Sequence, residues 1–276
     1  MTLIVAERVG LQVRILSDTA VSDREAAHAE SIPGVLKAVV LSPRTCIAFA
    51  GKIHGAYDVI RRIARESGRD SAIMEVAGAL LEHNIETGDA TEFILAHDEN
   101  LLKIGQSKIY EGSKRYWVGE ADAASQWHRR RDHVLKCTDE DANEGFAASM
   151  VAFLQVLDDS EYPSVRGLHF LVVRAKDGYR YERGIHVTSP RAIAPGETVL
   201  AASGGPEGGG LSYSYLVTKQ AGLPVVAVYF PPGRIGFLYM PLESDDALRY
   251  RADTLRDFAI AVSDSHGIEL SGMYVT

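Results

Sequence analysis

Thr2 is the first candidate for chemistry in this chain, because it directly follows the initiator methionine. A hydroxyl is a poor nucleophile unless a base takes its proton. A free α-amino group on the same residue, with an ordinary pKa of about 7.7–8.0, can act as that base. Removal of Met1 would free this amine, and threonine is small enough for methionine aminopeptidase to accept. Thr2 also suits the start of a strand as a β-branched residue, so the residue alone supports both interpretations.

Three more residues could have either a catalytic or a purely structural role. They are Asp18 in LSDTAVSD, Lys37 in GVLKAVVL and Gly51 at the end of CIAFAG. Asp18 lies in the segment Ser17-Asp18-Thr19, whose composition is typical of a turn. Lys37 could be a solvent-facing charge on an edge strand, where lysine discourages aggregation. Gly51 fits a position that needs unusual backbone angles. Each residue therefore has a structural interpretation beside a catalytic one.

The elements that must position these residues alternate between strands and helices. Hairpins are predicted at 3–8 with 11–17, at 36–41 with 45–50 and at 168–175 with 179–187; further strands at 91–97, 101–106, 108–110 and 116–118; and helices at 55–68, 71–88, 120–132 and 141–157. Paired hairpins with grouped helices favour antiparallel sheets over a parallel βαβ arrangement. The predicted fold class is therefore α+β, as a four-layer αββα sandwich of two antiparallel sheets between helical layers.

From about residue 188 the residue composition of the chain changes. The segment TSPRAIAPGETVLAASGGPEGGG is rich in turn residues, a hairpin is predicted at 225–230 with 236–241, and a closing helix at 245–267. We therefore predict a main domain over 1–187 and a C-terminal extension over 188–276 that packs on the same domain.

The opening stretch and this order of elements resemble the proteasome β-subunit family, including the HslV-type peptidases. Members of that family are N-terminal-nucleophile hydrolases with an αββα sandwich. The resemblance is carried by Thr2, Asp18, Lys37 and the run CIAFAGKIHGAYDVIRR, which is similar to the family's GFAG strand end and the helix after it. It covers roughly residues 2–187.

The resemblance implies a mechanism and a set of roles. Thr2 Oγ1 would attack a peptide or amide carbonyl while its own amine accepts the proton. Lys37 would lower the pKa of the hydroxyl, Asp18 would hold Lys37 by a charge-assisted hydrogen bond, and the backbone N–H of Gly51 would stabilise the oxyanion. The expected function is thus a threonine peptidase or amidohydrolase that assembles as a homo-oligomer, with or without an unfoldase partner.

Two motifs depart from the family pattern. The family's Gly-Ser-Gly turn is here the Gly-Glu-Ala segment at 119–121, so the serine that assists the amine is missing. The family's later Asp-x-x-Ser pair has Glu161 and Ser164 as its counterpart, which makes these two residues possible auxiliaries. A noncatalytic scaffold or ring subunit and a small-molecule amidase of the same superfamily therefore remain as alternative functions.

Composition narrows the partners. The net charge of −8 and the pI near 5.6 argue against nonspecific binding to nucleic acid or to anionic membranes. No segment reaches the ~18 consecutive apolar residues of a membrane span, and we expect a cytoplasmic protein without a secretory leader.

Cofactor and metal sites are not expected either. Cys46 and Cys137 are too few for a disulfide framework or a thiolate metal site. His128, Asp132 and His133 lie in the run QWHRRRDH, but a solvated helix face or a subunit contact suits such a mixture with arginine better than a metal.

Overall fold

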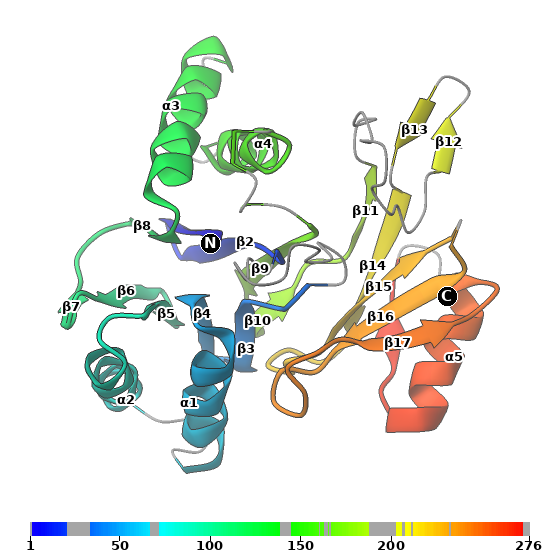
Figure 1. Cartoon of the computed structure of the whole chain (residues 1–276), viewed down its shortest axis with the longest axis horizontal. Helices are drawn as coiled ribbons and strands as arrows, with labels where there is room; N and C mark the ends of the chain where they lie inside the picture. The colour runs from blue at the N-terminus through cyan, green and yellow to red at the C-terminus, as the bar shows by residue number, and fades with distance from the viewer. Residues whose placement is uncertain are drawn as a thin grey trace.

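The structure is a computed structural model, and it describes residues 2–20, 34–66, 72–138, 145–159, 161–162, 165, 167–187, 203–205, 208–210, 212–231 and 233–272. Within these ranges the chain combines α-helices with antiparallel strands, which confirms the mixed composition predicted from the sequence. Figure 1 shows two sheets with helices beside them and a third sheet that lies to one side.

Sheet A is antiparallel, with the strand order β10-β9-β2-β1-β8. Its strands are β1 (Leu3–Val9), β2 (Gln12–Asp18), β8 (Arg115–Gly119), β9 (His169–Ala175) and β10 (Gly178–Tyr181). β1 and β2 form the first predicted hairpin, and Gly10 in its turn has a φ of +61°, which glycine adopts without steric cost. Because the hairpin folds back on itself, the start of β1 lies beside the end of β2.

Sheet B is also antiparallel, with the strand order β3-β4-β5-β6-β7. Its strands are β3 (Ala38–Ser42), β4 (Thr45–Gly51), β5 (Thr91–His97), β6 (Asn100–Gly105) and β7 (Lys108–Tyr110). β3 and β4 form the second predicted hairpin. Four of these strands consist largely of buried residues, as expected for a sheet that is covered on both faces.

Helices pack on one face of each sheet. α1 (Ile53–Glu66) and α2 (Ile73–Glu86) bury Ile60 and Leu80 against Phe93 of sheet B. α3 (Ala121–Thr138) and α4 (Gly145–Leu157) bury Trp127 and Phe153 against sheet A. The apolar residues of these helices recur at a spacing of three to four, so one stripe of each helix faces its sheet.

The other faces of sheets A and B share one apolar core. It contains Ile15 and Val172 from sheet A and Ile94 from sheet B. Tyr181 of sheet A forms hydrogen bonds to sheet B. Its hydroxyl donates to the Ala38 carbonyl at 2.9 Å and accepts from the Val40 N–H at 3.2 Å. The two sheets are therefore joined by side-chain packing and by hydrogen bonds to the first strand of sheet B.

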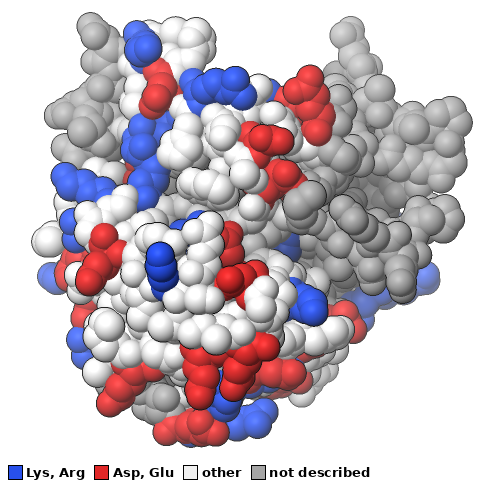
Figure 2. All heavy atoms as spheres, turned by 60° about the vertical axis from the view of Figure 1, so that its left-hand side comes forward, with Lys and Arg blue, Asp and Glu red and all other residues white. Residues whose placement is uncertain are grey.

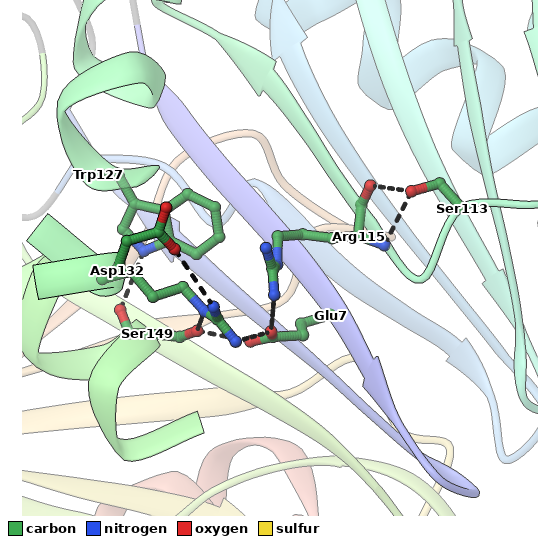
Figure 3. Close-up of polar contacts among 7 residues, drawn as sticks. Glu7, Ser113, Arg115, Trp127, Asp132 and Ser149 are labelled. Carbon is green, nitrogen blue, oxygen red and sulfur yellow. Dashed lines mark hydrogen bonds and ion pairs between the residues drawn. The ribbon is translucent and has the colours of Figure 1, made fainter. Parts of the chain in front are cut away.

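A buried charged cluster fastens the helices to sheet A (Figure 3). Glu7 of β1 accepts from Arg115 and Arg131, each with a nitrogen 2.7 Å from Oε1, and from the Ser149 hydroxyl at 2.5 Å on Oε2. Arg131 Nε also donates to Ser149 Oγ at 2.7 Å. These residues come from β1, β8, α3 and α4, so the cluster joins four elements through one carboxylate.

Sheet C is formed by residues near the C-terminus, in the order β11-β14-β15-β16-β17, with β18 paired to β14. Its strands are β11 (Gly184–Val187), β14 (Ser212–Thr218), β15 (Val226–Phe230), β16 (Ile235–Tyr239), β17 (Leu248–Arg251) and β18 (Leu270–Ser271); β12 (Ser203–Gly205) and β13 (Gly208–Gly210) pair separately. One face of sheet C packs into the core shared by sheets A and B, and the other packs on α5 (Leu255–His266).

Two predicted elements differ most from the structure, and the helix predicted at 120–132 runs on to Thr138 as α3. The predicted strand 179–187 is divided between β10 of sheet A and β11 of sheet C, because the chain crosses from one sheet to the other at 182–183. The predicted closing helix 245–267 begins only at Leu255, since the Thr254 side chain caps it by accepting from the N–H of Asp257, and β17 occupies the residues before it. The division into domains at 187/188 stays a prediction.

Candidate active site

Thr2 lies immediately before β1 and exposes only 3% of its surface. Its carbonyl accepts from the N–H of Glu120 at 2.7 Å, which ties the first residues of the chain to the end of β8. Gly119 packs so closely there that a Cβ on it would lie 2.0 Å from the Thr2 carbonyl oxygen. The Thr2 carbonyl is therefore held closely against the end of β8.

Asp18 and Lys37 meet at the Thr2 hydroxyl. Thr2 Oγ1 donates to Asp18 Oδ1, the last residue of β2. Lys37 lies directly before β3 of sheet B, and its Nζ is 2.5 Å from Thr2 Oγ1 and 3.1 Å from Asp18 Oδ1. Asp18 is fully buried and Lys37 exposes 3%. The structure thus brings together the three side chains that the sequence singled out.

The contacts of Lys37 use all the protons of an ammonium group. Besides Thr2 and Asp18, Nζ donates to the Ala20 carbonyl at 2.5 Å. A protonated lysine has three donors and no acceptor, so these contacts hold the charged form and leave no lone pair on Nζ. In this geometry an ammonium at Lys37 would have every proton engaged, and the catalytic role of Lys37 stays a prediction.

Burial perturbs both partners of the ion pair. It raises the pKa of Asp18 to about 6, although the Lys37 charge and a hydrogen bond from the Leu3 N–H favour the carboxylate. Burial likewise lowers the pKa of Lys37, against the opposing effect of Asp18. A buried pair of this kind costs desolvation energy that its mutual attraction only partly offsets. Perturbed groups gather at functional sites more often than elsewhere.

Gly51 ends β4 with a φ of +126°, a conformation that favours glycine. A Cβ at this position would lie 2.2 Å from the Ala90 carbonyl oxygen and 2.7 Å from the Thr91 Cα. Backbone geometry and close packing against β5 therefore explain the glycine. The role of its N–H as an oxyanion donor stays a prediction.

The proposed auxiliary residues are less defined. Glu161 is exposed, and its N–H donates to Asp159 Oδ1 at 3.0 Å in the turn after α4. Ser164 lies outside the described residues. The auxiliary role of both residues stays a prediction.

Glu92 is a neighbour of the site that the sequence did not predict. Glu92 Oε2 accepts from the Gly119 N–H at 3.4 Å, and Oε1 pairs with Lys103 Nζ at 3.0 Å. Gly119 has a φ of +107°. The family resemblance had already associated the segment 119–121 with the amine of Thr2, whereas no local signal in the sequence pointed to Glu92.

Charges on the surface are of both signs. On the face shown in Figure 2, acidic side chains gather along the lower edge and basic ones at the upper left, and neither sign covers the whole face. Among the residues that the structure describes, no group of three or more His, Cys, Asp or Glu side chains is arranged to hold a metal ion. None of the described helices is long and apolar enough to cross a membrane.

No protein-family model matches the chain, and no curated protein matches it in sequence. Among solved structures, the chain is similar to eukaryotic HslV from Trypanosoma brucei, with 17% sequence identity and a TM-score of 0.47. That alignment covers 62% of this chain and 98% of the other. The contacts of Thr2, Asp18 and Lys37 stand independently of this likeness.

Proposed function

We propose that this protein is a hydrolase that cleaves peptide or amide bonds with Thr2 as an N-terminal nucleophile after removal of Met1. One observation carries the proposal: a buried ammonium, Lys37 Nζ, lies 2.5 Å from Thr2 Oγ1 and is paired with Asp18 at 3.1 Å. A cation so close to a hydroxyl stabilises the alkoxide character that develops on the oxygen during attack. Burying two charges for packing alone is rarely favourable.

The reaction has two covalent steps. In the first, the Thr2 α-amine takes the proton from Oγ1 as Oγ1 bonds to the substrate carbonyl carbon, and the protonated amine then gives this proton to the departing nitrogen as the C–N bond breaks. In the second, a water molecule attacks the resulting ester, and its proton passes through the same amine to Oγ1 as the C–O bond breaks. Thr2 is regenerated with its hydroxyl and free amine.

The amine is a better base for this task than Asp18. Its ordinary pKa is about 7.7–8.0, whereas the pKa of Asp18 is raised only to about 6. The amine therefore holds the transferred proton more strongly, while Asp18 keeps Lys37 in place. The hydrogen bond from Thr2 Oγ1 to Asp18 Oδ1 would be exchanged for one to the amine when Met1 is removed.

The finer parts of the proposal concern architecture and further groups. We assign the four-layer αββα arrangement to the segment 1–187, with the C-terminal extension 188–276 packed on it, and a homo-oligomer as the working assembly. The N–H of Gly51 is the proposed oxyanion donor, and Glu161 and Ser164 are proposed auxiliaries. Support for the layers comes from α1 and α2 packing on sheet B, and α3 and α4 packing on sheet A.

The proposal is tested by intact-mass analysis and covalent labelling of protein made in cells. An epoxyketone that reacts with both the hydroxyl and the free amine of an N-terminal threonine should add once to the chain without Met1. Peptide mapping should place the adduct on Thr2. Because Thr2 exposes only 3% of its surface, labelling also reports whether substrates reach the hydroxyl.

Two variants serve as controls for this experiment. Thr2→Ala should give no adduct, while Thr45→Ala should label like the unaltered chain; Thr45 is also buried, and its hydroxyl bonds the His97 ring at 3.0 Å, away from Lys37. Retained Met1 together with no adduct on Thr2 would overturn the hydrolase. The noncatalytic scaffold would then be the function to pursue.

A further inference from the structure

His169 lies directly opposite Asp18 in the ladder that pairs β2 with β9. Directly opposite residues of an antiparallel pair have Cβ atoms about 5 Å apart on the same face of the sheet. Both residues are buried, with His169 exposing 7% and Asp18 none of its surface. The backbone position of Asp18 is therefore tied to that of His169.

Tyr215 of sheet C reaches this point of sheet A. It belongs to β14, and its hydroxyl donates to the His169 carbonyl. Its ring packs edge-on against His169 and Phe170, with centroid distances of 5.8 and 5.4 Å. Burial raises the pKa of Tyr215 well above its usual range, so the hydroxyl keeps its proton and remains a donor.

Tyr215 is itself rigidly held. Its strand lies inside sheet C, where Tyr215 pairs with Gly184 of β11 on one side and Val228 of β15 on the other. A second contact secures the same part of sheet A, since the Leu168 N–H donates to Thr19 Oγ1 at 2.9 Å. Leu168, the residue before His169, is thereby fixed against the residue that follows Asp18 at the end of β2.

We propose that Tyr215 is a positioning residue for Asp18, acting through the His169 carbonyl, and that the C-terminal sheet in this way completes the site. This inference rests on the proposed function for its consequence in the reaction, because Asp18 holds the ammonium beside the nucleophile. It gives the C-terminal segment a task in the mechanism. If Tyr215 had only a structural role, removing its hydroxyl would have the same effect as removing that of any other buried tyrosine in sheet C.

Tyr215→Phe removes the hydroxyl and keeps the ring, and Tyr229→Phe is its matched control. Tyr229 is also buried in sheet C, and its hydroxyl donates to the Ala252 carbonyl at 2.9 Å. It packs with α5 on the opposite face of the sheet. Each substitution therefore deletes one hydroxyl that bonds a backbone carbonyl, but only one of them reaches sheet A.

The two variants are compared by labelling of Thr2 in the full chain. For Tyr215→Phe we expect the saturating rate of epoxyketone labelling to fall about tenfold, with the reagent concentration for half-saturation changed by less than about twofold. For Tyr229→Phe both quantities should stay within about twofold of the unaltered chain. Equal rates in the two variants would overturn the inference while the proposed function stands.

A second readout does not need activity. In protein labelled with ¹³C at the aspartate carboxyl carbons, the Asp18 signal is identified by its loss in Asp18→Asn. Tyr215→Phe should shift this signal, and Tyr229→Phe should leave it in place. An unshifted Asp18 signal in Tyr215→Phe would refute the positioning role, whereas a shifted signal in a chain whose Thr2 never labels would refute only the proposed function.

Discussion

Lys37 Nζ lies 2.5 Å from Thr2 Oγ1, although the two residues are 35 positions apart and precede the first strands of different sheets. The carbonyl of Lys37 also accepts from the Phe49 N–H at 3.0 Å, so its backbone continues the pairing of β3 with β4. The ammonium is thus delivered by sheet B to a hydroxyl that sheet A presents. The site depends on the packing of the two sheets against each other.

Lys37→Met should abolish labelling of Thr2 and lower the free energy of unfolding by about 3–5 kcal/mol, because Asp18 would remain buried without its partner. Urea denaturation and the epoxyketone reaction measure the two effects. Adding Asp18→Asn should restore part of the stability but none of the labelling. Lys103→Met is the control, since Lys103 pairs with Glu92 at 3.0 Å and does not contact Thr2; undiminished labelling of Lys37→Met would contradict the role of the cation.

Gly119→Ala should displace Thr2, because the new Cβ would lie 2.0 Å from the Thr2 carbonyl oxygen. The matched control is Gly112→Ala, which has a φ of +87° but no atom within 4 Å of its Cβ. Backbone strain alone should cost the control about 1 kcal/mol and leave labelling intact. The collision should cost Gly119→Ala more than the control and slow the labelling of Thr2. Similar behaviour of the two variants would show that the close contact has no bearing on the nucleophile.

The sequence was sufficient to predict the first hairpins of sheets A and B. It also predicted the two helix pairs that follow them along the chain. Their signals are local: a glycine turn after β1 and apolar residues at the spacing of strands or helices. The closeness of Thr2 and Asp18 also follows from a local signal, since a hairpin with its turn at Gly10 brings the start of β1 beside the end of β2. The meeting of both with Lys37 was suggested by a family resemblance, because the packing of two sheets leaves no local pattern.

Sheet C shows where local signals end. The chain crosses from sheet A to sheet C between Tyr181 and Gly184, inside a segment that reads as one continuous strand. The contact between Tyr215 and His169 joins residues 46 positions apart through a hydroxyl and a backbone carbonyl. Neither the residue types nor their spacing predicts this contact, so only the three-dimensional structure reveals it.

Arg131→Met should destabilise the fold more strongly than most substitutions on α3. It would remove one of the cations that bond Glu7 Oε1 at 2.7 Å and the donor to Ser149 Oγ, leaving a buried carboxylate with fewer partners (Figure 3). We expect a loss of about 3 kcal/mol in the free energy of unfolding. Asp132→Asn, at an exposed side chain 3.8 Å from Arg131, should stay within about 0.5 kcal/mol; equal losses in urea denaturation would contradict the importance of the cluster.

Asp18 should make the protein less stable as the pH rises from about 4 to about 6. Its pKa is raised from 3.8 in the unfolded chain to about 6 in the folded chain, mainly by burial. Between these pH values the folded state binds more protons than the unfolded state, so the free energy of unfolding falls as pH increases. A shift of this size corresponds to a loss on the order of 2–3 kcal/mol that is complete above pH ~6.

Urea denaturation between pH 4 and pH 7 isolates this effect when Asp18→Asn is compared with the unaltered chain, because the variant lacks the group that titrates. Asp98→Asn is the control with the opposite sign. A hydrogen bond from Arg44 lowers the pKa of Asp98, so its contribution to stability is present above the unfolded pKa and is lost as the pH falls through the folded pKa. Between pH 4 and pH 7 this contribution is nearly constant, so removing Asp98 should leave the slope of stability against pH nearly unchanged in this range, whereas removing Asp18 should flatten it. A pH profile unchanged by Asp18→Asn would mean that Asp18 is ionised throughout this range and that the Lys37 charge outweighs the cost of its burial.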